Sequence, residues 1–132
     1  MSDVIQYIAD HYGGEAERPW VRAPAYTVFR HRDNGRIYGM ITTAPLSRLG
    51  GTGDAPIDVI TLKVGDALLR DMLIAQEGFY PGLGFGQRSW ITILLDGSVP
   101  MEDIRFFIDR SFSITASART RKQNNRAGGF ES

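Results

Sequence analysis

Apolar residues recur along this chain with two spacings, one typical of helices and one typical of strands. Three segments place them three or four residues apart, which gives a helix one apolar face. The first covers residues 3–12, with Asp3 as its expected N-cap, and the second covers residues 66–77. The third follows Ser98, which we expect to cap it, and continues to Thr115. The sequence therefore predicts three amphipathic helices.

Strand-like segments lie between these helices. Residues 25–31 and 36–43 flank an Asn-Gly pair, which favours the tight turn of an antiparallel hairpin. Residues 57–63 form a third such segment, and residues 89–96 alternate most clearly between two faces. A short strand is also expected within the glycine-rich residues 79–87. In the second strand we expect one face to carry Ile37, Gly39 and Ile41 and the other to carry Tyr38, Met40 and Thr42.

The order of these elements predicts the fold class. It reads α-β3-α-β2-α, which indicates an α+β domain with a single, mostly antiparallel sheet and helices packed mainly on one face. A chain of 132 residues with 42% hydrophobic residues is sufficient for one core. We expect one domain over residues 1–115 and a flexible basic tail over residues 116–132. The cations of this tail are Arg119, Arg121, Lys122 and Arg126.

The composition narrows the classes of function. The chain has no cysteine, which excludes disulfides, thiolate nucleophiles and cysteine-ligated metals. The first residues lack the basic and continuous apolar segments of a signal peptide. No stretch reaches the ~20 apolar residues of a membrane-spanning helix. We therefore expect a soluble, cytoplasmic protein with no membrane partner.

Charge is balanced over the whole chain, since 15 Lys and Arg residues accompany 15 Asp and Glu residues. A neutral chain has no overall field that attracts nucleic acid, so any such binding depends on a local surface. Arg88 and Trp90 form one candidate, because residues two apart on a strand share a face. A guanidinium can pair with phosphate while an indole stacks on a base. In the alternative, Trp90 packs under the third helix or a loop and Arg88 is solvated.

A second candidate surface is the tip of the first hairpin. Arg30, Arg32 and Arg36 lie close to its turn and could contact phosphates. The alternative is that these charges, with Asp33 among them, serve solubility. The basic tail has the same two interpretations, since it could add salt-sensitive affinity for a phosphate backbone or simply solubilise the chain end.

The sequence contains no pattern typical of catalysis, metal binding or nucleotide binding. His11 and His31 belong to different elements, and His31 near Asp33 or Asp58 is more simply a hydrogen-bonded surface histidine. The glycine-rich stretch precedes a strand, whereas a phosphate-binding loop opens a helix. We therefore expect no enzyme activity, no metal and no cofactor.

Four separated blocks of this sequence carry a resemblance to a known family. They agree in order and spacing with the YjbR/MmcQ family, and the match runs from about residue 3 to residue 115. The blocks are Pro19-Trp20 with residues 25–31, then residues 57–63, 77–82 and 90–100.

The resemblance implies a fold called CyaY-like or secretion-chaperone-like, with the element order already predicted. Members of the family are commonly described as DNA-binding or DNA-binding-like. The resemblance thus implies a non-enzymatic module that binds DNA weakly. This chain departs from the family at residues 83–89, where a Tyr-His-Met-Asn-Lys run usually precedes the tryptophan. Arg88 and Trp90 are left to supply the contacts of that run.

An alternative function follows from the likeness to secretion chaperones. It is a protein-interaction or small-ligand-binding module, either monomeric or homodimeric. Tyr80, Leu83 and Phe85 would then form an apolar patch with Trp90. Exposed apolar patches on soluble domains commonly mark such partners.

Overall fold

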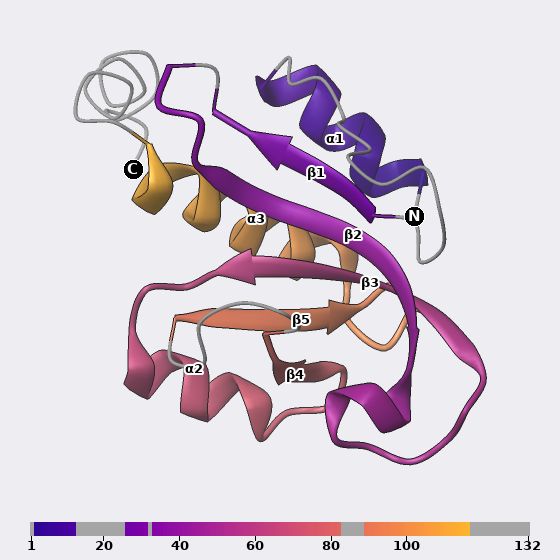
Figure 1. Ribbon diagram of the computed structural model, residues 1–132. Helices are drawn as coiled ribbons and strands as arrows, with labels where there is room; N and C mark the ends of the chain where they lie inside the picture. The colour runs from indigo at the N-terminus through magenta and orange to yellow at the C-terminus, as the bar shows by residue number, and fades with distance from the viewer. Residues whose placement is uncertain (1, 13–25, 32, 83–88, 117–132) are drawn as a thin grey trace.

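A sheet of five strands and three α-helices make up the computed structural model, which describes residues 2–12, 26–31, 33–82 and 89–116. The element order confirms the predicted α-β3-α-β2-α arrangement and the α+β class (Figure 1). The elements are α1 (Ser2–Tyr12), β1 (Tyr26–Arg30), β2 (Ile37–Pro45), the short 3₁₀ helix η1 (Leu46–Leu49), β3 (Pro56–Lys63), α2 (Ala67–Ile74), β4 (Phe79–Pro81), β5 (Trp90–Leu94) and α3 (Met101–Thr115).

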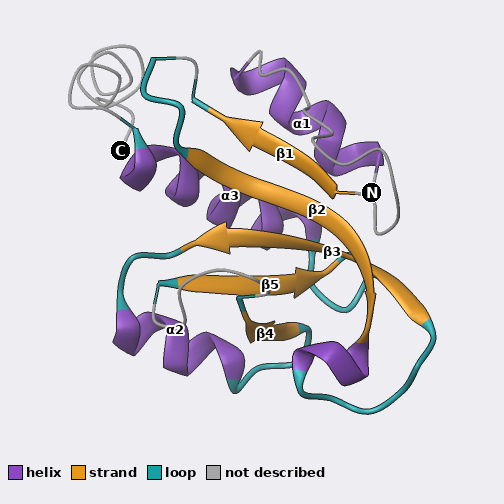
Figure 2. Ribbon diagram, viewed as in Figure 1, coloured by secondary structure: helices purple, strands orange, loops and turns teal. Residues whose placement is uncertain are grey.

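The strands pair in the order β1-β2-β3-β5-β4, and every pair is antiparallel. Helix α3 runs behind β2 and β3, and α1 lies beside β1, while α2 packs against β4 and β5 (Figure 2). The helices therefore cover one face of the sheet, which we call the helical face. The part of the chain that the structure describes has no helix of the length and apolarity needed to cross a membrane.

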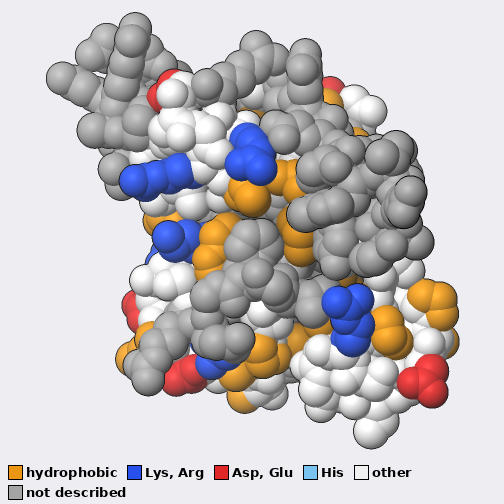
Figure 3. Space-filling model, viewed as in Figure 1, with side chains coloured by type: hydrophobic (Ala, Val, Ile, Leu, Met, Phe, Trp, Pro, Cys, Tyr) orange, Lys and Arg blue, Asp and Glu red, His pale blue; other side chains and the backbone are white. Residues whose placement is uncertain are grey.

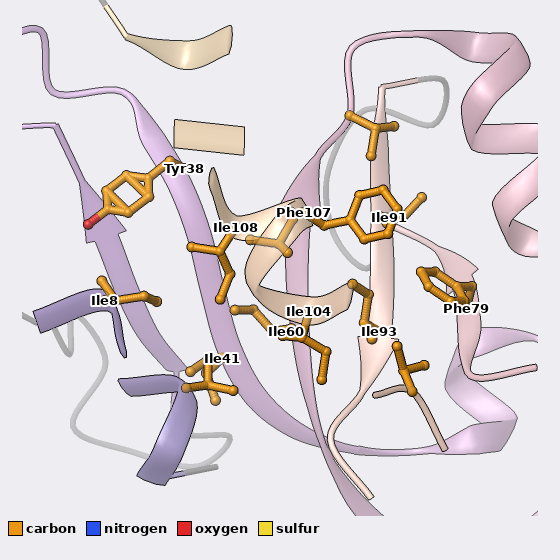
Figure 4. Close-up of a cluster of buried hydrophobic side chains, with 14 of the residues drawn as sticks. Ile8, Tyr38, Ile41, Ile60, Phe79, Ile91, Ile93, Ile104, Phe107 and Ile108 are labelled. Carbon is orange, nitrogen blue, oxygen red and sulfur yellow. The ribbon is translucent and has the colours of Figure 1, made fainter. Parts of the chain in front are cut away.

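The core lies between the helical face and the apolar side of α3. Alternate residues of the two central strands point toward the helix and are fully buried, as are Ile104 and Ile108 of α3 (Figure 4). The same alternation between two faces predicted the last strand from the sequence. The strand residues concerned are Ile60 and Leu62 of β3 with Ile91 and Ile93 of β5.

Tyr38 departs from the alternation expected for β2. Phe29 pairs with Gly39 but Arg30 pairs with Ile37, so Tyr38 is an extra residue in its strand. Such a bulge turns the inserted side chain out of the regular alternation. Tyr38 is consequently buried among the aromatic residues of the helical face, with the Phe112 ring centroid 4.9 Å from its own. The prediction that Tyr38 lies on the same face of the sheet as Met40 and Thr42 was wrong.

Two of the expected helix caps are also wrong. Asp3 lies inside the first turn of α1, because the helix already begins at Ser2. Ser98 does not cap α3, since its backbone N–H and its hydroxyl both donate to the carboxylate of Asp96. The residue before α3 is instead Pro100, which provides no side-chain cap.

The apolar residues of α2 divide between two sides of the helix. Leu73 is buried in the core and Leu69 packs against it. Leu68 and Met72, one turn apart, are instead 70% and 59% exposed. The aspartate before the helix, Asp66, caps it by accepting hydrogen bonds from two backbone N–H groups of the first turn. Ala116, the first residue of the predicted tail, is buried, and the rest of that tail, residues 117–132, lies outside the described residues.

Candidate functional site

The sheet face turned away from α3 carries a row of threonines, and we call it the threonine face. Its centre is buried, and the hydroxyls of Thr61 and Thr92 lie 2.9 Å apart in a hydrogen bond between neighbouring strands. Strand register places the other members of this face beside them. The buried members are Val28, Met40, Thr42, Val59, Thr61, Thr92 and Leu94.

One end of the threonine face brings together Arg30, Lys63 and Trp90, and we call it the basic–aromatic end. Arg30 ends β1, Lys63 ends β3 and Trp90 begins β5. All three have the strand parity of the threonine face, and Lys63 pairs directly with Trp90. Neighbouring strands lie about 5 Å apart, so Arg30 stands about 10 Å from Lys63, with β2 between them. Lys63 was not among the site residues predicted from the sequence, although its place two residues after Thr61 indicates that it lies on this face.

Charge is distributed unequally over the two faces of the sheet. Within the described strands, Asp58 is the one carboxylate, and it shares strand parity with Ile60 of the helical face. Its Oδ1 accepts a hydrogen bond of 2.8 Å from Thr43. Figure 3 shows Lys and Arg side chains spread over the side opposite α3, with hydrophobic side chains between them and the visible acidic ones toward the margins. Among the charged residues of the described strands, the threonine face therefore carries the cations and the opposite face carries the carboxylate.

Trp90 is partly buried, and its backbone is fixed on both sides. It pairs with Lys63 in one neighbouring strand, and its carbonyl accepts a hydrogen bond from the N–H of Gly82 at 3.1 Å. A Cβ atom on Gly82 would lie 2.5 Å from the Cβ of Trp90, so only glycine allows this approach. The structure therefore gives the glycine at this position a role in placing the indole.

The hairpin tip is ordered by local hydrogen bonds and by contact with α3. Arg30 Nη1 donates to the carbonyl of Gly35 at 3.1 Å, and the side-chain oxygen of Asn34 accepts from the backbone N–H of Arg36 at 2.8 Å. Asn34 Nδ2 also donates to the carbonyl of Thr115 at 3.1 Å. The tip that carries Arg30 and Arg36 is therefore anchored to the end of α3.

His31 belongs to the same anchor and is buried, so the surface position expected from the sequence was wrong. Its Nε2 lies 2.8 Å from the hydroxyl of Thr115, which itself donates to a backbone carbonyl of α3. The histidine nitrogen is thus the donor to this hydroxyl. Burial lowers the pKa of His31, an effect that Arg36 increases while Asp33 and the carbonyl of Phe112 oppose it.

A second polar cluster joins α1 to α3. Tyr7 donates to both oxygens of Asp109 at 2.8 and 2.9 Å, and Tyr12 donates to the same carboxylate. Burial and the hydrogen bond to Asp109 raise the pKa of Tyr7 to about 12 and raise that of Tyr12 further. Both phenols therefore stay protonated near neutral pH, which suits a structural link between helices better than proton transfer.

The described residues bring no three His, Asp or Glu side chains into positions that could hold a metal ion. Tyr80 is partly buried against the small apolar cluster of Leu49, Val59 and Leu94. The remaining predicted site residues lie outside the described part of the chain. They are Arg32, Leu83, Phe85, Arg88, Arg119, Arg121, Lys122 and Arg126.

Comparisons with known proteins agree on one family. A family model described as YjbR matches residues 10–114. The uncharacterized protein YyaQ of Bacillus subtilis (strain 168) is 31% identical over 113 residues, which cover 86% of this chain and 95% of that protein.

Solved structures give the same result for the fold. The crystal structure of a Pseudomonas syringae protein superposes with a TM-score of 0.82 at 35% identity, covering 87% of this chain and 97% of that one. A Deinococcus radiodurans protein with a domain described as DUF419 has a TM-score of 0.66 at 18% identity, covering 93% of this chain and 86% of that one. The second likeness shows the fold alone.

Proposed function

This chain belongs to the YjbR family, and we propose that it is a non-enzymatic binding domain that contacts nucleic acid weakly through the basic–aromatic end of its threonine face. The observation that carries the proposal is the charge of this face. The charged strand residues on it are the cations Arg30 and Lys63, whereas the carboxylate of the described strands lies on the other face. Local positive charge of this kind attracts phosphate on a chain with no net charge.

The three side chains have complementary roles in this proposal. Arg30 and Lys63 would contact successive phosphates, with Arg36 at the neighbouring hairpin tip as a third cation. The side chain of Lys63 makes no hydrogen bond or ion pair with the rest of the described chain, so its ammonium remains available for phosphate. Trp90, partly buried beside Lys63, would present the remaining surface of its indole to a base. Single-stranded nucleic acid suits this arrangement best, because its bases are free to stack.

The direct test is a titration of fluorescently labelled single- and double-stranded DNA at several salt concentrations. Each phosphate contact with single strands contributes about −0.7 to the slope of log affinity against log salt. Three cations therefore predict a slope of roughly −2. Absence of binding at tens of micromolar protein in low salt would reject the proposal.

A protein-binding function is the second candidate, and one observation favours it. Leu68 and Met72 expose apolar side chains one turn apart on α2, away from the core. Such a stripe can pack against a partner chain, including a second copy of this one. Sedimentation of the wild type and of Leu68→Glu would test it, since a dimer that uses this stripe should dissociate in the variant. A monomer at all concentrations would remove the homodimer.

A further inference from the structure

A cavity of about 300 Å³ lies at the corner where α1 and α3 begin. Its wall combines the first turn of α1 with one continuous segment that follows β5 and leads into the first turn of α3, and these two parts of the chain are far apart in sequence. This corner lies away from the basic–aromatic end, because it follows the last residue of β5 whereas Trp90 is the first. The lining residues that decide its chemistry are Asp3, Val4, Leu95, Val99, Met101 and Ile104.

The wall of this cavity is mainly apolar and firmly placed. Val4, Val99 and Ile104 are buried members of the main core, and Leu95 and Met101 pack against that core. Small-molecule sites usually have such walls, with one or a few polar groups that fix the ligand's orientation. A volume of about 300 Å³ is at the lower end of the usual range for small-molecule pockets, which leaves room for a ring and a short chain.

Asp3 gives the cavity its charge. It is the one charged side chain that the described residues contribute to the lining, and it makes no hydrogen bond or ion pair within that part of the chain. The first turn of α3 beside it adds Glu102 and Asp103, whose side chains likewise have no hydrogen-bond or ion-pair partner among the described residues. Among the described residues, no Lys or Arg lines the cavity to offset these groups.

The start of α3 opposes this charge only in part. Its first backbone N–H groups receive no side-chain cap from Pro100, and such groups favour an anion. A free anion at this corner would, however, meet three carboxylates within the first turns of the two helices. Charge complementarity thus selects a cation, and the apolar wall selects a cation with an apolar body.

We infer that this cavity binds a small amphipathic amine, with its apolar ring or chain against Val99 and Ile104 and its ammonium group at Asp3. The site is independent of the nucleic-acid surface. The carboxylate accepts charge-assisted hydrogen bonds from the ammonium, and the neighbouring acids add to the local field. An amine of this size should bind with a Kd on the order of a millimolar, as expected for a ligand with few atoms.

The experiment follows amide and methyl NMR signals of the whole chain during titration with three probes of similar shape. These are 2-phenylethylamine, which is cationic at pH 7, neutral 2-phenylethanol and anionic 3-phenylpropionate. We expect saturable shifts at Val99 and Ile104 with all the probes that bind. The amine should bind about threefold to fivefold more tightly than the alcohol, which is the usual size of an exposed charge interaction, and the carboxylate should bind least.

Asp3→Asn tests the role of the carboxylate. It should remove the preference for the amine and leave binding of the alcohol unchanged, which shows at the same time that the cavity is intact. Glu77→Gln is the matched control, because it removes one exposed acid outside the cavity and should change neither affinity. Three results would overturn the inference: no saturable shift below 20 mM amine, equal affinity for amine and alcohol in the wild type, or an unchanged preference in Asp3→Asn.

Discussion

Gly82 shows how a single residue places the candidate site. Its N–H binds the carbonyl of Trp90, and its missing side chain allows β4 to approach the start of β5. An added Cβ would meet the Cβ of Trp90 at 2.5 Å and its carbonyl carbon at 2.9 Å. Rotation of the indole moves neither this Cβ nor this carbonyl carbon, so the strand itself would have to shift.

Gly82→Ala should therefore lower the free energy of unfolding by about 1–3 kcal/mol, which is the usual range for overpacking. Urea unfolding followed by circular dichroism measures this loss. Gly39→Ala is the control, since its added Cβ would meet no atom nearer than 3.4 Å. Equal stability of the two variants would show that the Gly82 approach is not a tight contact.

His31 links the hairpin tip to α3 in a way that depends on its charge. Burial lowers its pKa below the ordinary value of 6.5, so the folded state favours neutral imidazole. The unfolded chain binds a proton more readily over the interval between these two values. The contribution of His31 to stability is therefore fully present above pH 6.5 and is lost as the pH falls toward the lowered pKa.

His31→Gln should remove this part of the pH dependence, because the amide can still donate to Thr115 but does not titrate. The measurement is the free energy of unfolding in urea at pH 5.5, 6.5 and 7.5. The wild type should lose more stability than the variant between the highest and the lowest of these values. A variant with the full slope of the wild type would contradict the assignment.

At the scale of elements, Ser111 joins α3 to two strands. Its hydroxyl donates to the carbonyl of Tyr38 at 2.6 Å and accepts from the backbone N–H of Lys63 at 2.9 Å. This pair of bonds lies where the bulge at Tyr38 interrupts the regular pairing. Ser111 thus holds the strand end that carries Lys63 from the opposite side of the sheet.

Ser111→Ala leaves both backbone groups without their partner, and should cost about 1–3 kcal/mol of stability. Ser113→Ala is a suitable control on the same helix, since that side chain is only partly buried. Hydrogen exchange should also show faster exchange of the Lys63 amide in Ser111→Ala alone. If both variants unfold at the same urea concentration, the bridge contributes nothing.

Periodicity predicted the helices and strands of this fold because it depends on neighbouring residues alone. The caps at Asp3 and Ser98 were wrong, since a competing local hydrogen bond or an earlier helix start decides them. The sheet face predicted for Tyr38 was wrong for a different reason. A bulge is a property of two paired strands, and a single strand pattern does not contain it.

The candidate site was predictable only in part. Arg30 and Trp90 were selected from residue type as members of two separate candidate surfaces, and the strand register puts both on one face of the sheet. Lys63 joins them because β3 lies between β2 and β5 in the sheet, an order that the sequence does not state. The cavity beside Asp3 was missed for the same reason, since it forms where the first turn of α1 meets a segment that is distant in sequence, from Leu95 to Ile104.

At the scale of the whole molecule, the two faces of the sheet differ in what they carry. The helical face provides the core, while the threonine face collects cations without a carboxylate among the described strands. Under the proposed function, this division would let a chain with no net charge attract phosphate. It also predicts that the location of a cation, and not the total charge, decides affinity.

The most direct measurement compares the affinity of Lys63→Gln and Arg105→Gln for labelled single-stranded DNA over a range of salt. Both variants lose one positive charge, but Arg105 is exposed on α3, where it lies over the ring of Tyr7 on the helical side. The account predicts that Lys63→Gln weakens binding and makes the salt slope shallower by about 0.7, whereas Arg105→Gln changes neither. Equal losses in the two variants, or none in Lys63→Gln, would contradict it.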